Sequence, residues 1–387
     1  MTGQFRRWIL GVLLAGIALA AGRGGAAVRT QSTKLRVAAV GQALIWTDLR
    51  RAAPVAVEQA RRYLADADVR FTNLETAVAP GDAAVKPRGE LAEWTDPDVL
   101  DCLKAMGFNM LSLSNNHAWD LGEAGIFTTI AEVRKRGFAH AGSGADDAAA
   151  VAPGVLDTPA GRVALIAMAS GGPQLTPDTW AGPRHAGVNF LELRSDGTLN
   201  AAHTERILKS VRDAARQVPY VIVYQHNHYW GDARGSGQPP DRDKHIDRFE
   251  TAPWMVEWAH RLIDAGASMY VSHGDPALHG VEIYKGRPIL YGLGNYIFHG
   301  AFSRDVYGPL AYMSAVAHAE FEGGRVTALS FEPIVLSFED KGSAPLGTPY
   351  LAESAEASLI LGYLRDVSRQ YGTEMQIKGS RGAVVLR

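Results

Sequence analysis

Four short polar motifs in this chain carry side chains of the types that bind metal ions. Each motif follows an apolar run, and the four are Asn73-Leu74-Glu75, Asn115-Asn116-His117, His226-Asn227-His228 and Ser272-His273-Gly274-Asp275. Neutral imidazole nitrogens and carboxylate oxygens suit Zn, Mn and Fe, and the same groups serve as general acids and bases. Any one of these histidines could be purely structural, and the Asn-Asn pair could form a simple turn. The recurrence of four such motifs favours one shared site.

The motifs lie where strands are predicted to end. Apolar runs predict strands at residues 34–40, 69–74, 110–113, 162–169, 220–224 and 268–271, and later, partly antiparallel strands at 281–284, 289–291, 313–321 and 326–335. Helical spacing predicts helices at 55–64, 96–106, 125–136, 204–217, 253–265 and 351–371. This alternation indicates a layered α/β sandwich. Because ligands bind beyond the carboxyl ends of strands in open α/β sheets, the four loops can converge at one edge.

Three local features accompany these elements. Asp96 precedes Pro97 and is expected to cap helix 96–106, which should end at Gly107. Cys102 falls within that helix and is expected to be buried. Asp120 stands three residues after His117, so it is a candidate to accept a hydrogen bond from the second nitrogen of that histidine.

The composition is that of an ordinary globular protein and excludes several classes. The chain has 387 residues, with 39 Lys and Arg against 41 Asp and Glu, for a net charge of −2. A basic surplus for nucleic-acid binding is absent, so no nucleic-acid partner is expected. The single cysteine excludes an intramolecular disulfide and any Cys-rich metal site.

Residues 1–27 are predicted to be an export signal peptide. Arg6 and Arg7 precede an apolar run at 8–21, which is shorter than the ~20 residues needed to span a bilayer. A twin-arginine signal and an uncleaved anchor are the alternatives. Residues 33–340 are expected to form the main domain, and 341–387 a helix and strand extension packed on it. The protein is therefore expected in the periplasm or cell envelope.

The chain from about Lys34 to Phe338 resembles the CapA family of capsule and poly-γ-glutamate synthesis accessory proteins. The resemblance is carried by the segments FTNLETAV, LSLSNNHAWDLGEAGI, HAGSGADDAAAVAP, GRVALIAMAS and GASMYVSHGDPALHGVEIYKGRPILYGLGNYIF. It implies an α/β fold, namely a layered α-β-β-α sandwich of the calcineurin-like metallophosphoesterase type. It also implies an anionic polymer, poly-γ-glutamate or a capsular polysaccharide, and membrane-bound synthesis machinery as partners.

The resemblance also implies roles for the motif residues. His117 corresponds to a histidine that faces the substrate, and it is assigned a catalytic role together with Asp120. The implied ligands of a divalent metal (Mn, Zn or Fe) are Glu75, Asn116, His226, His228, His273 and Asp275. The candidate substrate-binding residues are Asn73, Asn115, Arg50 and Arg88.

Two departures from the family pattern affect the expected metal content. Gln42 stands where the family usually has an aspartate after the first strand, and Pro276 stands at an expected histidine, for which Asp275 or His279 could substitute. A two-metal centre needs a bridging carboxylate between ions ~3.5–4 Å apart. One ion, two ions through substitute ligands, and none all remain open. Restoring the acid with Gln42→Asp is expected to increase metal occupancy.

Two functions follow from these residues. The first is an exported metal-dependent hydrolase-like enzyme that acts on an anionic cell-envelope polymer. The second is a non-catalytic accessory protein that binds the polymer and has a degenerate metal site. In that second interpretation Trp46, Trp119, Tyr229 and Trp230 could stack on a sugar or an amide backbone, although such residues also serve as core or rim packing.

Overall fold

The computed structural model describes residues 34–79, 87–89, 92–172, 174–229, 251–274, 276–299, 308–338 and 344–387. All of these residues belong to one compact unit, Ser32–Arg387. The predicted signal peptide, Trp230 and Asp275 lie outside the described residues. Within the described residues, no helix combines the length and apolar character that crossing a membrane requires.

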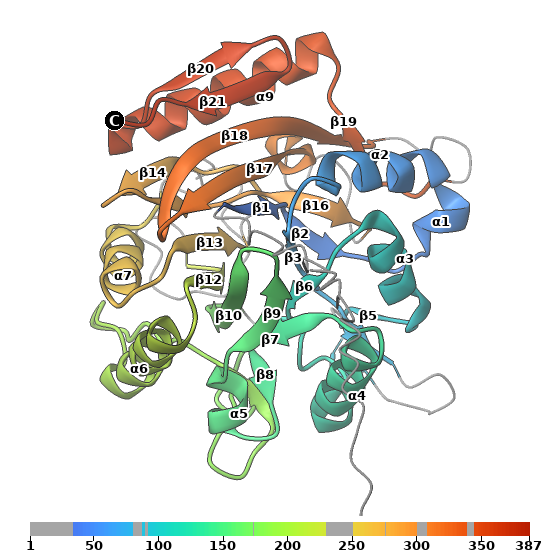
Figure 1. Cartoon of the computed structure of the whole chain (residues 1–387). Helices are drawn as coiled ribbons and strands as arrows, with labels where there is room; N and C mark the ends of the chain where they lie inside the picture. The colour runs from blue at the N-terminus through green and yellow to red at the C-terminus, as the bar shows by residue number, and fades with distance from the viewer. Residues whose placement is uncertain are drawn as a thin grey trace, which may run out of the picture. The chain divides into compact units, whose positions relative to one another are not determined.

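The larger of two main sheets has nine strands and joins both ends of the described chain (Figure 1). In chain order, its first four strands run parallel to one another. Its later strands pair in the antiparallel direction. In spatial order they are β20 (Met375–Lys378), β21 (Arg381–Val384), β18 (Arg325–Leu336), β17 (Met313–Glu322), β1 (Leu35–Ala39), β3 (Val69–Asn73), β6 (Met110–Ser112) and β7 (Ala139–Ala141), with β19 (Pro349–Leu351) beside β18.

The second main sheet has six strands. In spatial order they are β14 (Val281–Tyr284), β15 (Arg287–Leu290), β13 (Met269–His273), β12 (Tyr220–Asn227), β10 (Gly161–Ser170) and β9 (Gly154–Thr158). Its central strands β10, β12, β13 and β15 are parallel. Three two-stranded pairs complete the strands: β2 (Gln42–Leu44) with β16 (Asn295–Phe298), β4 (Ala77–Val78) with β5 (Trp94–Thr95), and β8 (Ser143–Gly144) with β11 (Gly187–Val188).

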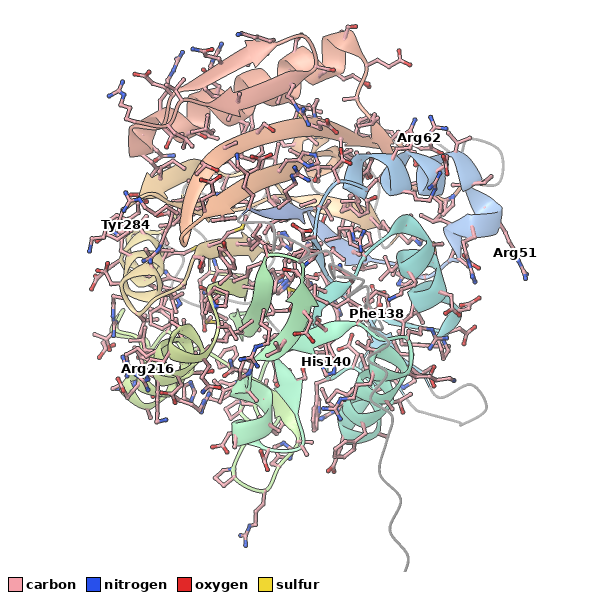
Figure 2. All side chains as sticks on the ribbon, viewed as in Figure 1. Arg51, Arg62, Phe138, His140, Arg216 and Tyr284 are labelled. Carbon is pink, nitrogen blue, oxygen red and sulfur yellow. The ribbon has the colours of Figure 1, made fainter. Side chains whose placement is uncertain are left out.

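Helices cover the outer faces of the sheets. On α6, the buried residues Thr204, Ile207, Leu208, Val211 and Ala214 recur at helical spacing, so one face of that helix packs on the sheet. The exposed Arg51, Arg62 and Arg216 stand on the outer side of their helices (Figure 2). The helices are α1 (Leu49–Ala52), α2 (Pro54–Leu64), α3 (Asp98–Met106), α4 (Gly122–Lys135), α5 (Asp147–Val151), α6 (Ala201–Gln217), α7 (Pro253–Asp264), η2 (Pro309–Tyr312), α9 (Ser354–Ser368) and η3 (Arg369–Tyr371).

Three apolar layers show how the sheets and helices stack. One layer lies between the two sheets and contains Phe71 of β3, Tyr224 of β12 and Phe331 of β18. A second layer joins the larger sheet to α2 and α3, and a third joins the smaller sheet to α6 and α7. The predicted α/β fold class, a layered α-β-β-α sandwich, is confirmed.

Two of the predicted local features of α3 are confirmed and one is wrong. Cys102 is buried in α3, and Gly107 ends that helix with a φ of 107°, a left-handed conformation that glycine adopts without a Cβ penalty. The expected cap by Asp96 is wrong, because Pro97 occupies the cap position and no side chain caps the helix. Asp96 and Pro97 therefore precede the helix, which begins at Asp98.

Removing a large side chain from between the sheets should test this layering. Phe331 is completely buried, so Phe331→Ala is expected to lower the free energy of unfolding by about 3–5 kcal/mol. Phe127 on α4 is 45% exposed, and Phe127→Ala is expected to change stability by no more than about 0.5 kcal/mol. Urea denaturation measures both values, and equal losses in the two variants would contradict the layering.

Candidate metal centre and active site

The carboxyl ends of strands from both sheets place three of the four polar motifs side by side. Glu75 follows β3, Asn116 follows the neighbouring strand β6, and His226 lies near the end of β12 in the other sheet. His228 comes just after β12, where the backbone N–H of His228 donates to the carbonyl of Ser170 at the end of β10. The convergence at one edge follows from the parallel direction of these strands.

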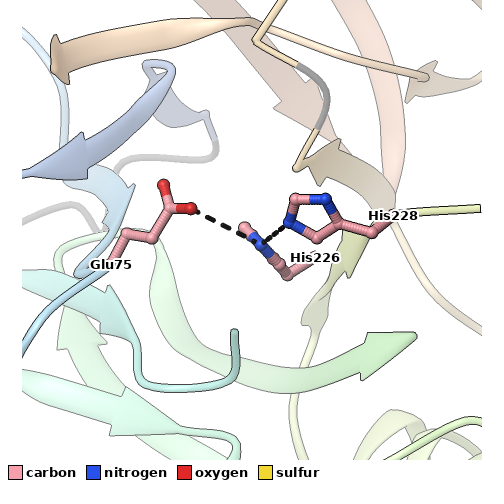
Figure 3. Close-up of side chains that lie close together, drawn as sticks. All are labelled: Glu75, His226 and His228. Carbon is pink, nitrogen blue, oxygen red and sulfur yellow. Dashed lines mark hydrogen bonds and ion pairs between the residues drawn. The ribbon is translucent and has the colours of Figure 1, made fainter. Parts of the chain in front are cut away.

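The Nε2 nitrogen of His226 is the point on which the side chains converge (Figure 3). It lies 2.7 Å from Asn116 Oδ1, 2.9 Å from His228 Nε2 and 3.6 Å from Glu75 Oε1. Asn116 Oδ1 is also 3.2 Å from His228 Nε2. These four atoms are the metal-binding atoms of their residue types, and ligands at ~2.1 Å from a tetrahedral ion would be about 3.4 Å apart.

The cluster holds more lone pairs than its own hydrogens can satisfy. An imidazole nitrogen carries one hydrogen at most, so the two facing Nε2 atoms and the amide oxygen cannot all be paired with one another. Glu75 Oε2 is buried and has no hydrogen-bond partner. Burial lowers the pKa of His226 well below its usual value, which keeps that ring neutral. Neutral imidazole, amide oxygen and carboxylate in this arrangement fit a single divalent cation.

Glu75 has the strongest electrostatic reason to meet a cation. Burial, together with the charges of Glu93 and Asp120, raises the pKa of Glu75 to about 8, although the charge of His117 opposes the rise. A carboxylate in such a setting is costly unless a positive charge compensates it. The backbone N–H of Glu75 donates to the carbonyl of Ala43 (2.9 Å), which fixes the backbone that carries the carboxylate.

Neighbouring groups orient the side chains of the cluster. Asn116 Nδ2 donates to Gln174 Oε1 (3.1 Å), which turns the amide oxygen of Asn116 toward the histidines. The Tyr224 hydroxyl lies 3.3 Å from His226 Nδ1 and leaves Nε2 for the centre. Gly172 has a φ of 100°, and a Cβ there would lie 3.0 Å from the Cβ of Asn116, so only glycine fits this close approach. Gln174 was not predictable from the sequence, because it belongs to no recognisable motif.

His117 is held by the acid that the sequence indicated. His117 Nδ1 donates to Asp120 Oδ2 at 2.7 Å, and Asp120 Oδ2 also accepts the backbone N–H of Glu93 at 2.6 Å. Burial alone would lower the pKa of His117, but the hydrogen bond and charge of Asp120, with the charges of Glu75 and Glu93, outweigh it and raise the pKa. Asp120 thus orients the His117 ring, and the catalytic role assigned to the pair stays a prediction. Glu93 was missed in the sequence because it stands outside the motifs.

Asn73 and Asn115 join two loops instead of facing the solvent. Both side chains are completely buried. Asn115 Nδ2 donates to Asn73 Oδ1 (3.2 Å) and to the Leu74 carbonyl (2.7 Å), while Asn115 Oδ1 accepts the backbone N–H of His117 (3.0 Å). The predicted substrate contact by these two residues is therefore corrected to a positioning role. They hold Glu75 and His117 at a fixed separation.

His273 lies beside the cluster without joining it. It is the register partner of His226 across β12 and β13, yet it lies outside the group whose ligand atoms fall within 4.8 Å of one another. Its ring packs against Tyr224 (centroids 5.1 Å apart) and Phe71 (6.5 Å), and neither ring nitrogen has a hydrogen-bond partner. Burial lowers the pKa of His273 to about 3. The role of Asp275 stays a prediction, since Asp275 lies outside the described residues.

The two predicted substrate-binding arginines differ in position. The Arg50 guanidinium donates to the carboxylate of Asp48 at the start of α1, with distances of 2.8–3.0 Å. Arg88 is closer to the candidate site, because its backbone N–H donates to the carbonyl of Asp120 (2.8 Å). The Arg88 guanidinium pairs with Asp178 at 3.0 Å on the surface.

Gln42 braces the site through both ends of its amide. Its Nε2 donates to Asn295 Oδ1 and its Oε1 accepts the backbone N–H of Gly274, both at 2.9 Å. Asn295 Nδ2 in turn donates to the Ala311 carbonyl (3.0 Å). Gln42 is 2% exposed, so these partners replace water completely. The amide therefore ties β2 to β16 and to the loop after β13.

Fold and site together define a class: layered α/β proteins with a metal-type cluster at the carboxyl ends of their strands. The family model described as bacterial capsule synthesis protein PGA_cap matches residues 36–300, and the chain belongs to this family. The CapA resemblance is thereby confirmed.

Three relatives show the range of similarity within that family. The chain is 28% identical to the uncharacterized protein y4sH of Sinorhizobium fredii, over 90% of this chain and 92% of that protein. It is 30% identical to a probable polyglutamine synthesis accessory protein of Mycobacterium tuberculosis, over 59% of this chain and 55% of that protein. It is 25% identical to the PGA biosynthesis protein CapA of Bacillus subtilis, over 54% of this chain and 48% of that protein.

The bracing role of Gln42 can be tested by the variant that the sequence suggested. Gln42→Asp removes the N–H that Asn295 Oδ1 accepts, so we expect the free energy of unfolding of the metal-free protein to fall by about 1–3 kcal/mol. Urea denaturation measures this loss. Elemental analysis of the same variant tests whether the new carboxylate raises metal occupancy. A metal-free variant as stable as the original protein would contradict the bracing role.

Proposed function

We propose that this protein is an exported, metal-dependent hydrolase-like member of the capsule synthesis family, acting on an anionic cell-envelope polymer. The observation that carries the proposal is the convergence of Asn116 Oδ1, His228 Nε2 and Glu75 Oε1 on His226 Nε2. Family membership and the names of the relatives support an accessory role in capsule or poly-glutamate synthesis. Export rests on Arg6, Arg7 and the apolar run that follows them.

Glu75, Asn116, His226 and His228 would hold one divalent ion. When bound, such an ion polarises a phosphoryl or carbonyl oxygen and lowers the pKa of a water molecule. His117 has its Nδ1 engaged by Asp120, which leaves its Nε2 to give a proton to a leaving-group oxygen. Asn73 and Asn115 keep the loop that bears His117 in register with the loop that bears Glu75.

Gln42 favours a second candidate, a polymer-binding accessory protein without turnover. Its amide oxygen already accepts the N–H of Gly274, and an amide does not compensate the charge of a cation as a carboxylate does. A centre limited in this way could retain a structural ion and a binding surface. The two candidates share the metal cluster and differ in whether His117 serves a reaction.

The metal assignment is tested by elemental analysis and metal titration of the purified protein. We expect about one Mn, Zn or Fe per chain, because one group of four ligand atoms is present in the described site. His226→Ala and Glu75→Gln should each weaken metal binding at least about tenfold. His260→Ala is the matched control, since His260 pairs with Glu282 outside the cluster and its loss should leave metal content unchanged. Equal metal content in all variants would disprove the site.

Turnover separates the two candidates. With a phosphodiester such as bis(p-nitrophenyl) phosphate, His117→Ala is expected to reduce kcat by about 10²–10⁴-fold while metal content stays the same, because His117 would act as an acid and not as a ligand. Loss of metal along with activity would make His117 a ligand instead. A metal-loaded original protein that hydrolyses neither this ester nor the polymer would support the binding candidate.

A further inference from the structure

Trp46 presents a large aromatic surface to solvent. Its side chain is 44% exposed, whereas Trp119, Trp258 and most other large apolar side chains of the described residues are buried. An exposed indole gains nothing from the hydrophobic core, so core packing does not account for its place. Trp46 stands two residues after the end of β2, the strand that carries Gln42.

The chain holds Trp46 in a fixed position in spite of this exposure. The backbone N–H groups of Trp46 and Thr47 both donate to His299 Nδ1, at 3.0 and 3.3 Å. Thr95 Oγ1 donates to the Trp46 carbonyl (3.4 Å). Burial raises the pKa of Glu93, and the nearby Trp46 indole opposes that rise, so the indole and the Glu93 carboxyl group lie close together. These hydrogen bonds fix the backbone that carries the exposed ring, which reduces the freedom that binding would otherwise remove.

Short links connect this ring to the candidate active site. Glu93, whose carboxyl group lies near the indole, donates its backbone N–H to Asp120 Oδ2, the atom that holds His117. On the other side, Trp46 continues the strand whose Ala43 carbonyl accepts the N–H of Glu75. A ligand seated on Trp46 would therefore lie on loops that adjoin those of His117 and Glu75.

The chemistry of this edge favours one class of polymer. The face of an indole is apolar and carries partial negative charge, so it attracts C–H groups and repels carboxylates. The neighbouring Glu93 carboxyl group can accept hydrogen bonds from hydroxyls but also disfavours anions. The nearby cation Arg88 is paired with Asp178. A pyranose ring, with an apolar C–H face and a rim of hydroxyls, matches these features, and a chain with a carboxylate on every residue does not.

We propose that Trp46 and Glu93 form a sugar-binding subsite, so that the polymer handled at this centre is a polysaccharide and not poly-γ-glutamate. The sugar ring stacks on the Trp46 indole and donates a hydroxyl hydrogen bond to Glu93. This subsite deepens the proposed function, because it names the substrate class of the same site. Binding at Trp46 does not itself require the metal ion.

Trp94 offers a matched control. It is 46% exposed, nearly the same as Trp46, and it lies next to Glu93 in the chain. Successive side chains of a strand point to opposite faces, and Thr95 is the residue of β5 that contacts Trp46. The Trp94 indole therefore lies on the face of β5 that points away from Trp46, and its loss removes an exposed tryptophan without touching the subsite.

The test is affinity electrophoresis of the full chain in gels that contain one polymer at a time. The probes are dextran, hyaluronan, the capsular polysaccharide extracted from the source bacterium and poly-γ-glutamate. We expect retardation by at least one polysaccharide, weakened about tenfold by Trp46→Ala and much less by Trp46→Phe, which keeps an aromatic face. Trp94→Ala should stay within about twofold of the original protein, and Glu93→Gln should weaken retardation less than Trp46→Ala.

Other outcomes would overturn the subsite. They are binding to poly-γ-glutamate alone, retardation by none of the polysaccharides, or equal losses in Trp46→Ala and Trp94→Ala. Metal content and unfolding midpoint are measured on the same samples, and both should be unchanged in Trp46→Ala. If the protein binds no metal but Trp46→Ala still abolishes polysaccharide binding, the hydrolase proposal fails and the subsite stands.

Discussion

His226 is completely buried, and its Nε2 faces an amide oxygen, a second imidazole nitrogen and a carboxylate oxygen within 3.6 Å. Burying several hydrogen-bond acceptors together costs free energy unless a cation or a hydrogen-bond donor lies among them. Much of the surrounding architecture serves to keep them together. Parallel strands of two sheets deliver the residues to one edge, and the buried asparagines Asn73 and Asn115 fix the loops that follow.

The same buried edge contains a second kind of polar group, one that is fully satisfied. Gln42 and Asn295 are engaged at each end by neighbouring groups, and their hydrogen bonds join segments far apart in the sequence. Amides whose hydrogen bonds are all made rigidify a core, whereas the atoms around His226 still have lone pairs that could bind a cation. Strand β2 contacts both kinds of residue. It carries Gln42, which has a structural role, and its Ala43 carbonyl accepts the backbone N–H of Glu75, a candidate metal ligand.

The sequence predicted the elements well because most are marked by local signals. Apolar runs and helical spacing located the long strands and helices, and Gly107 marked a helix end, but short elements such as β2, β8 and α5 carried no such signal. The pair His117 and Asp120 was also predictable, because three residues separate them. Glu93, Gln174 and the partners of Gln42 were not, since their contacts depend on tertiary approach over long sequence distances. Asn73 and Asn115 were assigned to substrate because residue type does not reveal burial.

The pairing of β1 with β17 has a consequence for how the chain reaches its native state. Leu35 pairs with Phe321, so β1 can form its hydrogen bonds with β17 only after most of the chain has been synthesised. Topologies dominated by such distant pairings fold slowly, because loop closure must precede the contacts that reward it. Until β17 arrives, one side of β1 has unpaired backbone groups, and this interval is when the nascent polypeptide is most open to misassociation or to helper proteins.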